Sequence, residues 1–447
     1  MKKSLTFLLL LFLIIGGALF YLQDHLKLIT GTAAKRMCSC VFVADRTAES
    51  VTDQDNNFSI VSYADASVDH TKRIASATVL GMAKQTAVYR EGLGCALVSD
   101  GYTADRLSTN SGAALQASLA TAAISTWPMG NQIVDSLLPA FDKTKLTAAM
   151  AVAFEKPALK TRAVVVLKDG QLIGEQYADG FDKDSPILGW SMTKSITSAL
   201  VGILVKEGKI NINEPVDIPE WKEDERSKIT MNNLLQMSSG LKWGEIYTTV
   251  SDVTKMLSLE GDMYQHAISV PAEAAPDTKF YYSSGTTNIV AGLIKKHFNR
   301  VEDYWAFPHT ALLDKIGMHS AVIEPDASGT FVGSSYCFAT PRDWAKFGQL
   351  YLNDGVWQGE RILPEGWVDY SRTPANASAK GYGAFFWLNA DGELADVPKD
   401  MYACNGFQGQ RVFILPSQNL VVVRMGLSEE GAFDFNEFLK NIIEATI

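Results

Sequence analysis

The sequence lacks several features that mark common classes of protein. It has no long run of lysine or arginine and carries a net charge of −10, which argues against nucleic acid as a partner. No repeat of 20 to 50 residues and no low-complexity segment is present. The six histidines are scattered and no Cys-x-x-Cys pair occurs, so we expect no metal and no cofactor. The composition, 47% hydrophobic and 20% charged, is typical of a globular chain.

One long apolar run lies at the N-terminus. Lys2 and Lys3 precede residues 5–22, LTFLLLLFLIIGGALFYL, which carry no charge and could cross a thin bilayer as a helix. The basic head favours a cytoplasmic N-terminus with the rest of the chain outside. We therefore expect residues 1–30 to be a membrane anchor or signal sequence. The protein would lie in the cell envelope, anchored in the inner membrane with its main domain in the periplasm. The alternatives are secretion after cleavage, for which Thr32-x-Ala34 is a weak site, and a buried soluble helix.

The five cysteines could form disulfides in an exported chain, but the sequence does not determine which of them pair. They are Cys38, Cys40, Cys95, Cys337 and Cys404. Two disulfides and one thiol can be drawn from them in many ways. We expect Cys40 to pair with Cys95, because both lie in the N-terminal region. The alternative is that all five are small buried hydrophobic residues.

The chain divides into a loop-rich region and one main domain. Residues 31–144 mix short apolar runs with many Ser, Thr, Asp and Gly residues, so we expect loops there. From residue 145 to residue 447 the pattern is regular. Two β-rich runs flank Asp169-Gly170, which is a strong hairpin signal.

Strands are expected near both ends of the main domain. The hairpin at residues 162–178 and a second at residues 411–426 should share one antiparallel sheet, with the amphipathic C-terminal helix FNEFLKNIIEATI on one face. The helix-rich middle should form a second lobe. The predicted class is therefore α/β (α+β), an antiparallel sheet flanked by helices plus a mostly helical lobe, with the N-terminal membrane helix in front.

The stretch GWSMTKSITSALVGILVK carries the first chemical signal. Its apolar spacing predicts a helix from about Ser191 to Lys206, on which Ser191 and Lys194 share a face. A serine hydroxyl needs a base to become a nucleophile. Lysine can serve if its pKa falls from about 10.4 toward neutrality. The alternative is an ordinary helix surface, because a Ser-x-x-Lys match arises easily by chance. A second match, Ser239-Gly240-Leu241-Lys242, follows a helix end and contains glycine, so its geometry is not secured.

Two further segments add candidates. In KFYYSSGTTNIVAGLIKK, Tyr282 and Ser284 lie at a turn that opens a helix, where a phenol can relay a proton and a hydroxyl can bond to lysine. In CNGFQGQRVFILP, a turn with Gly406 feeds a strand whose N–H near Phe407 could bind an oxyanion. Taken singly, the first fits core aromatic residues with a helix cap, and the second fits an ordinary turn.

The order of these segments resembles a known family. GWSMTKS, LLQMSSGLKW, FYYSSGTTN, ATPRDWAKFGQLYLNDGVW and GFQGQRVFILP together resemble the β-lactamase-related serine hydrolases, which include class C β-lactamases and penicillin-binding proteins. They are most similar to the 6-aminohexanoate-dimer hydrolase branch. The resemblance covers about residues 145–445 and implies the β-lactamase/transpeptidase-like fold.

The resemblance also implies roles. Ser191 matches the acylated nucleophile and Lys194 its base. Tyr282 matches the tyrosine that shuttles the proton, and Ser284 fills the Asn/Ser position of the same motif. Trp190 would line the substrate site, and the oxyanion donor falls near Gly406 and Phe407. The expected substrate is a small ester, amide or peptide-like molecule.

The third motif departs from the family pattern. It appears as Asn405-Gly406-Phe407, or shifted as Phe407-Gln408-Gly409, without the usual lysine or histidine. Because that cation normally holds the substrate carboxylate, the departure argues against β-lactamase or carboxypeptidase activity. The alternatives to an esterase or amidase are a penicillin-binding peptidase or β-lactamase, and a membrane-tethered sensor that only binds a ligand.

Overall fold

The chain forms two compact units in a computed structural model. The structure describes residues 2–99, 101–109, 126–134 and 138–447, apart from most side chains of the first 24 residues. The N-terminal unit comprises residues 1–90, 95–110 and 244–261, and the main unit comprises residues 91–94, 111–243 and 262–447. The short segment 244–261 therefore interrupts the main unit in sequence and belongs to the N-terminal unit in space.

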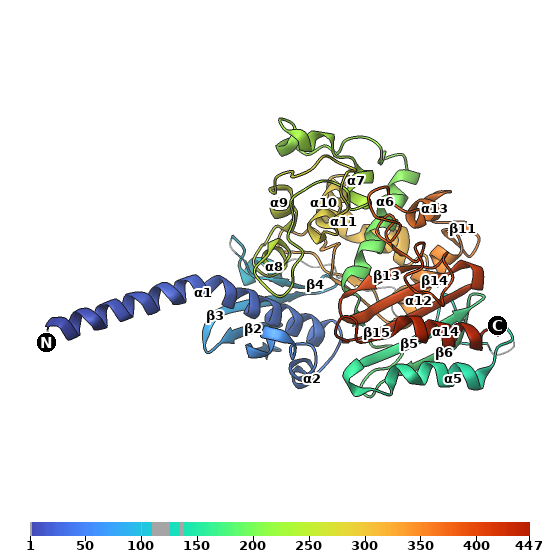
Figure 1. The fold of residues 1–447 in the computed structure, drawn as a ribbon, viewed down its shortest axis with the longest axis horizontal. Helices are drawn as coiled ribbons and strands as arrows, with labels where there is room; N and C mark the ends of the chain where they lie inside the picture. The colour runs from blue at the N-terminus through green and yellow to red at the C-terminus, as the bar shows by residue number, and fades with distance from the viewer. Residues whose placement is uncertain (1, 100, 110–125, 135–137) are drawn as a thin grey trace. The chain divides into compact units, whose positions relative to one another are not determined.

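A long helix and a small sheet build the N-terminal unit (Figure 1). Helix α1 spans Lys2–Phe42, and the four-stranded sheet has the order β1-β2-β3-β4. The strands are β1 (Asp65–Asp69), β2 (Ile74–Val79), β3 (Met82–Arg90) and β4 (Gly94–Leu97), and the short helices are α2 (Ala48–Asp53), α3 (Ala104–Ser108) and α8 (Asp252–Ser258). Gly31 lets α1 approach α8 closely, because a Cβ there would lie 2.5 Å from the Ser258 carbonyl oxygen. The two helices also share a 3.0 Å hydrogen bond between the hydroxyls of Thr32 and Ser258.

The prediction that residues 31–144 are loop-rich is wrong for the described part of that region. Helix α1 continues to Phe42, and four strands follow it. Three of these strands, β1, β2 and β3, are only partly buried, so their sequences lack a continuous apolar run. In β2, for example, buried Ala75, Ala77 and Val79 alternate with partly exposed Ile74, Ser76 and Thr78, so the segment is not continuously apolar.

The structure gives no support for the predicted membrane-spanning helix. Within the described part of the chain, no helix combines the length and the apolar character needed to cross a bilayer. The predicted span, residues 5–22, lies in α1, and most of its side chains fall outside the described residues.

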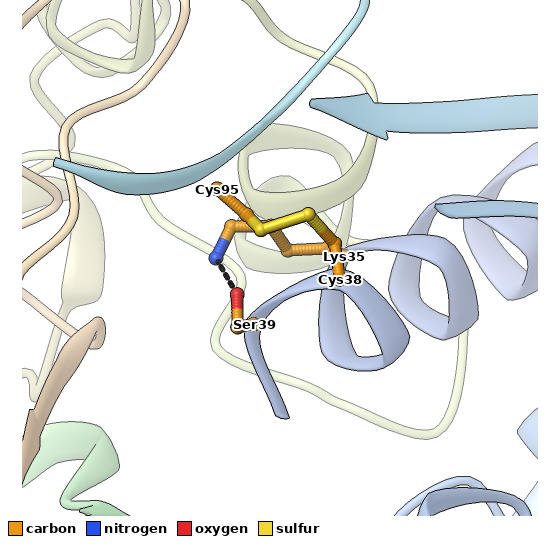
Figure 2. Close-up of a disulfide and its surroundings, with 4 residues drawn as sticks. All are labelled: Lys35, Cys38, Ser39 and Cys95. Carbon is orange, nitrogen blue, oxygen red and sulfur yellow. Dashed lines mark hydrogen bonds between the residues drawn. A yellow bond between two sulfur atoms is a disulfide. The ribbon is translucent and has the colours of Figure 1, made fainter. Parts of the chain in front are cut away.

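One disulfide lies within the N-terminal unit, and it joins Cys38 to Cys95 (Figure 2). The predicted pair Cys40–Cys95 is therefore wrong. Residues 38 and 40 are about 200° apart around a helix, so only one of them can face Cys95. Beside the disulfide, Lys35 donates a 2.9 Å hydrogen bond to the Ser39 hydroxyl one turn along α1.

An antiparallel six-stranded sheet forms the centre of the main unit. Its order is β12-β13-β14-β15-β5-β6. The strands are β12 (Trp387–Leu388), β13 (Tyr402–Gly406), β14 (Gln410–Leu415), β15 (Leu420–Gly426), β5 (Thr161–Lys168) and β6 (Gln171–Tyr177). Strand β15 pairs with β5, from Leu420 opposite Lys168 to Met425 opposite Ala163. The two predicted hairpins therefore share one sheet, as expected.

Helices cover both faces of this sheet. Helices α5 (Lys143–Ala151) and α14 (Phe435–Ala445) enclose a core with alternate strand residues, among them Val164, Phe413 and Val422. Helix α12 (Pro341–Leu352) packs on the opposite face, where a Cβ at Gly348 would meet Val412 and Val421. The C-terminal helix thus covers the sheet as predicted (Figure 1).

The remaining elements form the predicted helical lobe and small connecting sheets. The helices are α6 (Thr193–Lys206), α7 (Met231–Leu235), α9 (Met263–Ile268), α10 (Ser284–Lys295), α11 (Val301–Pro308) and α13 (Trp367–Arg372). The short strands are β7 (Ile187–Leu188), β8 (Val322–Ile323) and β9 (Cys337–Ala339), in the order β7-β9-β8, and the pair β10 (Val356–Trp357) and β11 (Glu360–Arg361). Helices α6 and α10 are almost entirely buried, which fixes the residues at their N-termini.

Candidate active site

Ser191 lies on a constrained turn between β7 and α6. The predicted helix begins two residues later than expected, because Trp190–Met192 form a 3₁₀ turn before α6 starts at Thr193. Trp190 has a φ of +49°, a left-handed conformation that is uncommon and strained for a bulky residue. The Thr193 hydroxyl donates to the Trp190 carbonyl at 2.7 Å and accepts from the Cys337 N–H at 3.1 Å. These bonds hold the half-buried Ser191 at the start of a buried helix.

The Lys194 ammonium is placed against Ser191, as the three-residue spacing predicts. Its Nζ lies 3.1 Å from Ser191 Oγ, 3.2 Å from Ser284 Oγ and 2.9 Å from the Ser334 carbonyl oxygen. The lysine is only 1% exposed. A carbonyl can only accept, so Lys194 donates to Ser334, whereas the two hydroxyls can each donate or accept. A neutral amine could therefore donate to Ser334 and Ser284 and still accept the Ser191 proton.

Tyr282 and Ser284 lie where α10 begins, next to the same lysine. Ser283 caps the helix, its hydroxyl accepting from the Thr286 N–H, and this fixes its two neighbours. Lys194 Nζ stands 4.7 Å from the centre of the Tyr282 ring. The ring packs against Trp387 at 5.4 Å, with their planes 37° apart.

The Gly406 turn lies beside the Ser191 turn. Gly406 ends β13 so close to Gly189 that a Cβ would lie 2.2 Å from the Gly189 carbonyl oxygen. The Phe407 ring meets the Trp190 ring edge-on at 5.9 Å. The structure thus brings the predicted site residues of the three separate segments together within the main unit.

The second Ser-x-x-Lys match does not form such a pair. Ser239 is buried and its hydroxyl accepts from the Leu241 N–H, whereas Lys242 is exposed. The glycine between them has a φ of +76°, so these residues do not share a helix face. The glycine and the position after a helix end, both noted in the sequence, account for this difference from Ser191 and Lys194.

Some neighbours of the site were not anticipated. The Ser334 carbonyl receives the Lys194 bond, and Asn288 on α10 accepts from the Ser334 N–H at 3.1 Å, which fixes that peptide. Tyr336 directly precedes strand β9, and its ring lies 6.1 Å from the Trp190 ring. No motif marks Ser334, because a backbone carbonyl carries no sequence signature.

Arg411 is the charged residue that donates a hydrogen bond to the Gly406 carbonyl of this turn. Burial lowers the pKa of Arg411 to about 10, although Tyr282, Glu430 and Glu393 act in the opposite direction. Among the described residues, no group of three or more His, Cys, Asp or Glu side chains is placed to hold a metal ion. The groups that the candidate site itself brings together are the hydroxyls of Ser191 and Ser284, the Lys194 amine and the Tyr282 phenol.

A fold of this kind with a serine, a lysine and a tyrosine together defines a serine hydrolase of the β-lactamase type. The family model described as beta-lactamase matches residues 147–445. The chain belongs to the beta-lactamase family.

Individual relatives show the same likeness. The 6-aminohexanoate-dimer hydrolase of Paenarthrobacter ureafaciens is 25% identical over 290 residues, which cover 59% of this chain and 72% of that protein. A structure from Bacillus anthracis, provisionally named a 6-aminohexanoate-dimer hydrolase, is 24% identical to this chain, with a TM-score of 0.54. The match covers 63% of this chain and 76% of the Bacillus anthracis chain. The structure of a family VIII carboxylesterase is 16% identical to this chain, with a TM-score of 0.51. The match covers 70% of this chain and 98% of the carboxylesterase.

Proposed function

We propose that this serine hydrolase cleaves a small carboxylic ester or linear amide through an acyl-enzyme on Ser191. The observation that carries the proposal is the contact of Lys194 Nζ with both Ser191 Oγ and Ser284 Oγ in a buried position. A binding module would have no need for a buried amine aimed at a hydroxyl.

The contacts support one sequence of steps. Ser191 Oγ attacks the substrate carbonyl carbon while its proton passes to Lys194 or Tyr282. The carbonyl π electrons move to oxygen, and the tetrahedral intermediate is held by the N–H groups of Ser191 and Phe407. When the C–O or C–N bond breaks, the proton moves through Tyr282 to the leaving group. Water then attacks the acyl carbon by the reverse path and releases the acid.

Two groups of aromatic rings include residues of the candidate site. Trp190, Phe407 and Tyr336 form one group, and Tyr282, Tyr382 and Trp387 form another. Aromatic side chains favour apolar contact with a ligand and supply few fixed charges. They therefore support a substrate that is uncharged next to the scissile bond.

Labelling at Ser191 tests the reaction class. The purified protein is treated with a fluorophosphonate, digested and examined by mass spectrometry, in parallel with panels of small esters and linear amides. We expect one adduct, on Ser191, and hydrolysis of at least one panel. An unlabelled wild-type protein, or equal labelling of Ser191→Ala, would show that the enzyme assignment is wrong.

The same panels separate the alternatives. A penicillin-binding peptidase or β-lactamase should acylate with a fluorescent penicillin and should prefer substrates that carry a carboxylate. Without a lysine or histidine at residues 405–407, we expect neutral esters to react faster than their carboxylate analogues. Strong labelling by the fluorescent penicillin would instead favour the peptidase or β-lactamase alternative.

We also propose that the protein acts outside the cytoplasm, held by its N-terminal segment. The Cys38–Cys95 disulfide supports an oxidising compartment, and Lys2 and Lys3 before the apolar run support export. Membrane fractionation followed by alkaline carbonate extraction tests the anchor. Recovery of the chain in the soluble periplasmic fraction would favour cleavage and secretion, and recovery in the cytoplasm would contradict both.

A further inference from the structure

The turn from Gly406 to Gln410 has each of its carbonyl groups bonded. Arg411 Nη1 donates to the carbonyls of Gly406 at 2.8 Å and Gln410 at 2.9 Å. The Gln410 side chain donates to the carbonyl of Phe407, and the Ser428 N–H donates to that of Gln408. The remaining carbonyl, that of Gly409, accepts from Arg424 on β15. Every peptide of the turn is thereby fixed in orientation.

One of these peptides carries the proposed oxyanion donor. The carbonyl of Gly406 and the N–H of Phe407 belong to the same peptide unit, which is trans. In a trans peptide the C=O and N–H bonds point in opposite directions. The bond from Arg411 to the Gly406 oxygen therefore fixes the direction in which the Phe407 N–H points.

The bond is made by a charged donor. A guanidinium that withdraws electron density at a carbonyl oxygen also polarises the N–H of the same peptide, because hydrogen bonds in a chain strengthen one another. Arg411 makes these bonds in a partly buried position, with its guanidinium carbon 4.8 Å from the centre of the Phe435 ring. Glu393 and Glu430 act on it electrostatically without forming a salt bridge among the described residues.

We propose that Arg411 is a positioning residue for the hydrolase reaction: it orients and polarises the Gly406–Phe407 peptide as an oxyanion donor. The inference rests on the proposed function, because it needs Ser191 as the nucleophile. It differs from a substrate-binding role, since the guanidinium acts through the backbone. Its effect should therefore fall on the transition state, where negative charge develops, rather than on the ground state.

Substitution of Arg411 tests the inference through kcat and KM separately. Arg411→Met removes the charge and the donors but keeps an aliphatic stem to pack on Phe435. Because the donor is misdirected rather than deleted, we expect kcat to fall by about 10- to 100-fold, with KM changed by less than about threefold. The rate of fluorophosphonate labelling at Ser191 should fall in parallel, because the reagent places an oxygen at the oxyanion position. Arg411→Lys, which restores the charge, should recover part of the lost rate.

Arg226 supplies a matched control. Its Nη1 also donates to two backbone carbonyls, those of Ile268 and Val270, each at 2.9 Å, and neither residue belongs to the Ser191 turn, to α10 or to the Gly406 turn. Arg226→Met should keep the wild-type kcat and labelling rate even if it lowers the melting temperature. Thermal melting of each variant reports whether it is folded.

The outcomes separate the two proposals. If wild-type Ser191 is not labelled, the proposed function fails, and the inference fails with it. If the wild type is labelled but Arg411→Met reacts at the same rate, only the role of Arg411 is overturned. A rise in KM at constant kcat would also overturn it, because the arginine would then bind substrate. Loss of rate in Arg226→Met equal to that in Arg411→Met would assign the effect to general destabilisation.

Discussion

The close approach of β13 to the Ser191 turn makes Gly406→Ala an informative substitution. An alanine Cβ would lie 2.2 Å from the Gly189 carbonyl oxygen and 2.9 Å from Gln410 Cβ. The substitution would not strain the backbone conformation, because Gly406 is extended, with φ −122° and ψ 158°, and any residue can adopt this conformation. The main effect of the substitution is therefore to push the Gly406 turn away from Gly189, in the segment before the nucleophile.

The overlap sets the expected magnitude. Relief of a 2.2 Å contact to ordinary van der Waals separation requires the strand end and the Ser191 turn to part by ~1 Å. A misplacement of about 1 Å in a reacting group can cost about 10²-fold in rate. Overpacking of this kind also costs about 1–3 kcal/mol of stability. We expect kcat/KM for a small ester to fall about 100-fold in a protein that remains folded.

Gly174→Ala is the matched control on the same sheet. A Cβ there would meet Met150 Cε and Sδ at 3.0 Å and Leu146 Cδ2 at 3.1 Å, all near the ends of flexible side chains. This variant should lose a little stability and keep its activity. Ester hydrolysis and thermal melting are measured for both variants. Wild-type kcat/KM in Gly406→Ala would refute the reasoning, because the turn could then move without consequence for the oxyanion donor.

Three further predictions follow from separate parts of the structure. Lys194→Met should lower kcat for ester hydrolysis by about 10²–10⁴-fold, as expected for loss of a general base, and a loss below tenfold would point to another base. Burial raises the pKa of Asp326 to about 6, above about 3.9 in the unfolded chain, so its contribution to stability is present below pH 4 and is lost as the pH rises through 6. The unfolding free energy of the wild type minus that of Asp326→Asn, from urea titrations, should therefore fall by ~2 kcal/mol between pH 4 and pH 7, and a constant difference would contradict the burial argument. Cys38→Ser should remove the only disulfide of the described residues and cost ~4 kcal/mol, given the 57-residue separation, whereas Cys40→Ser should leave the Cys38–Cys95 crosslink intact in non-reducing peptide maps.

The sheet and the nucleophile were predictable because their signals are local. The strands at residues 161–168 and 420–426 are continuously or almost continuously buried, so they appear as apolar runs bounded by turn residues. Ser191 and Lys194 are three residues apart at the start of a helix, so secondary structure alone brings their side chains together. The order of motifs along the chain then indicated which distant segments join them.

The parts that sequence could not supply depend on long-range packing. Segment 244–261 joins the N-terminal unit although residues 111–243 separate it from the rest of that unit in sequence, and no pattern within it shows that association. The choice of Cys38 over Cys40 depends on how α1 is rotated about its axis. The Lys194 bond to the Ser334 carbonyl involves a main-chain atom that every residue has. In each case the missing information is the placement of one element against another.

The altered third motif changes where positive charge acts in this site. A lysine or histidine at residues 405–407 would extend a cation from the strand toward a substrate. Here that stretch is Asn-Gly-Phe, and Arg411 on the adjoining strand donates to the main chain of the turn. The positive charge then acts through a peptide group on the oxyanion, and aromatic rings occupy the surroundings. An anionic substrate group would have to leave water for apolar contacts without a dedicated partner, which is costly. The same change that removes a carboxylate anchor thus leaves Ser191, Lys194 and Tyr282 in place, which supports the proposal that the substrate is a neutral ester or amide rather than a penicillin-like acid.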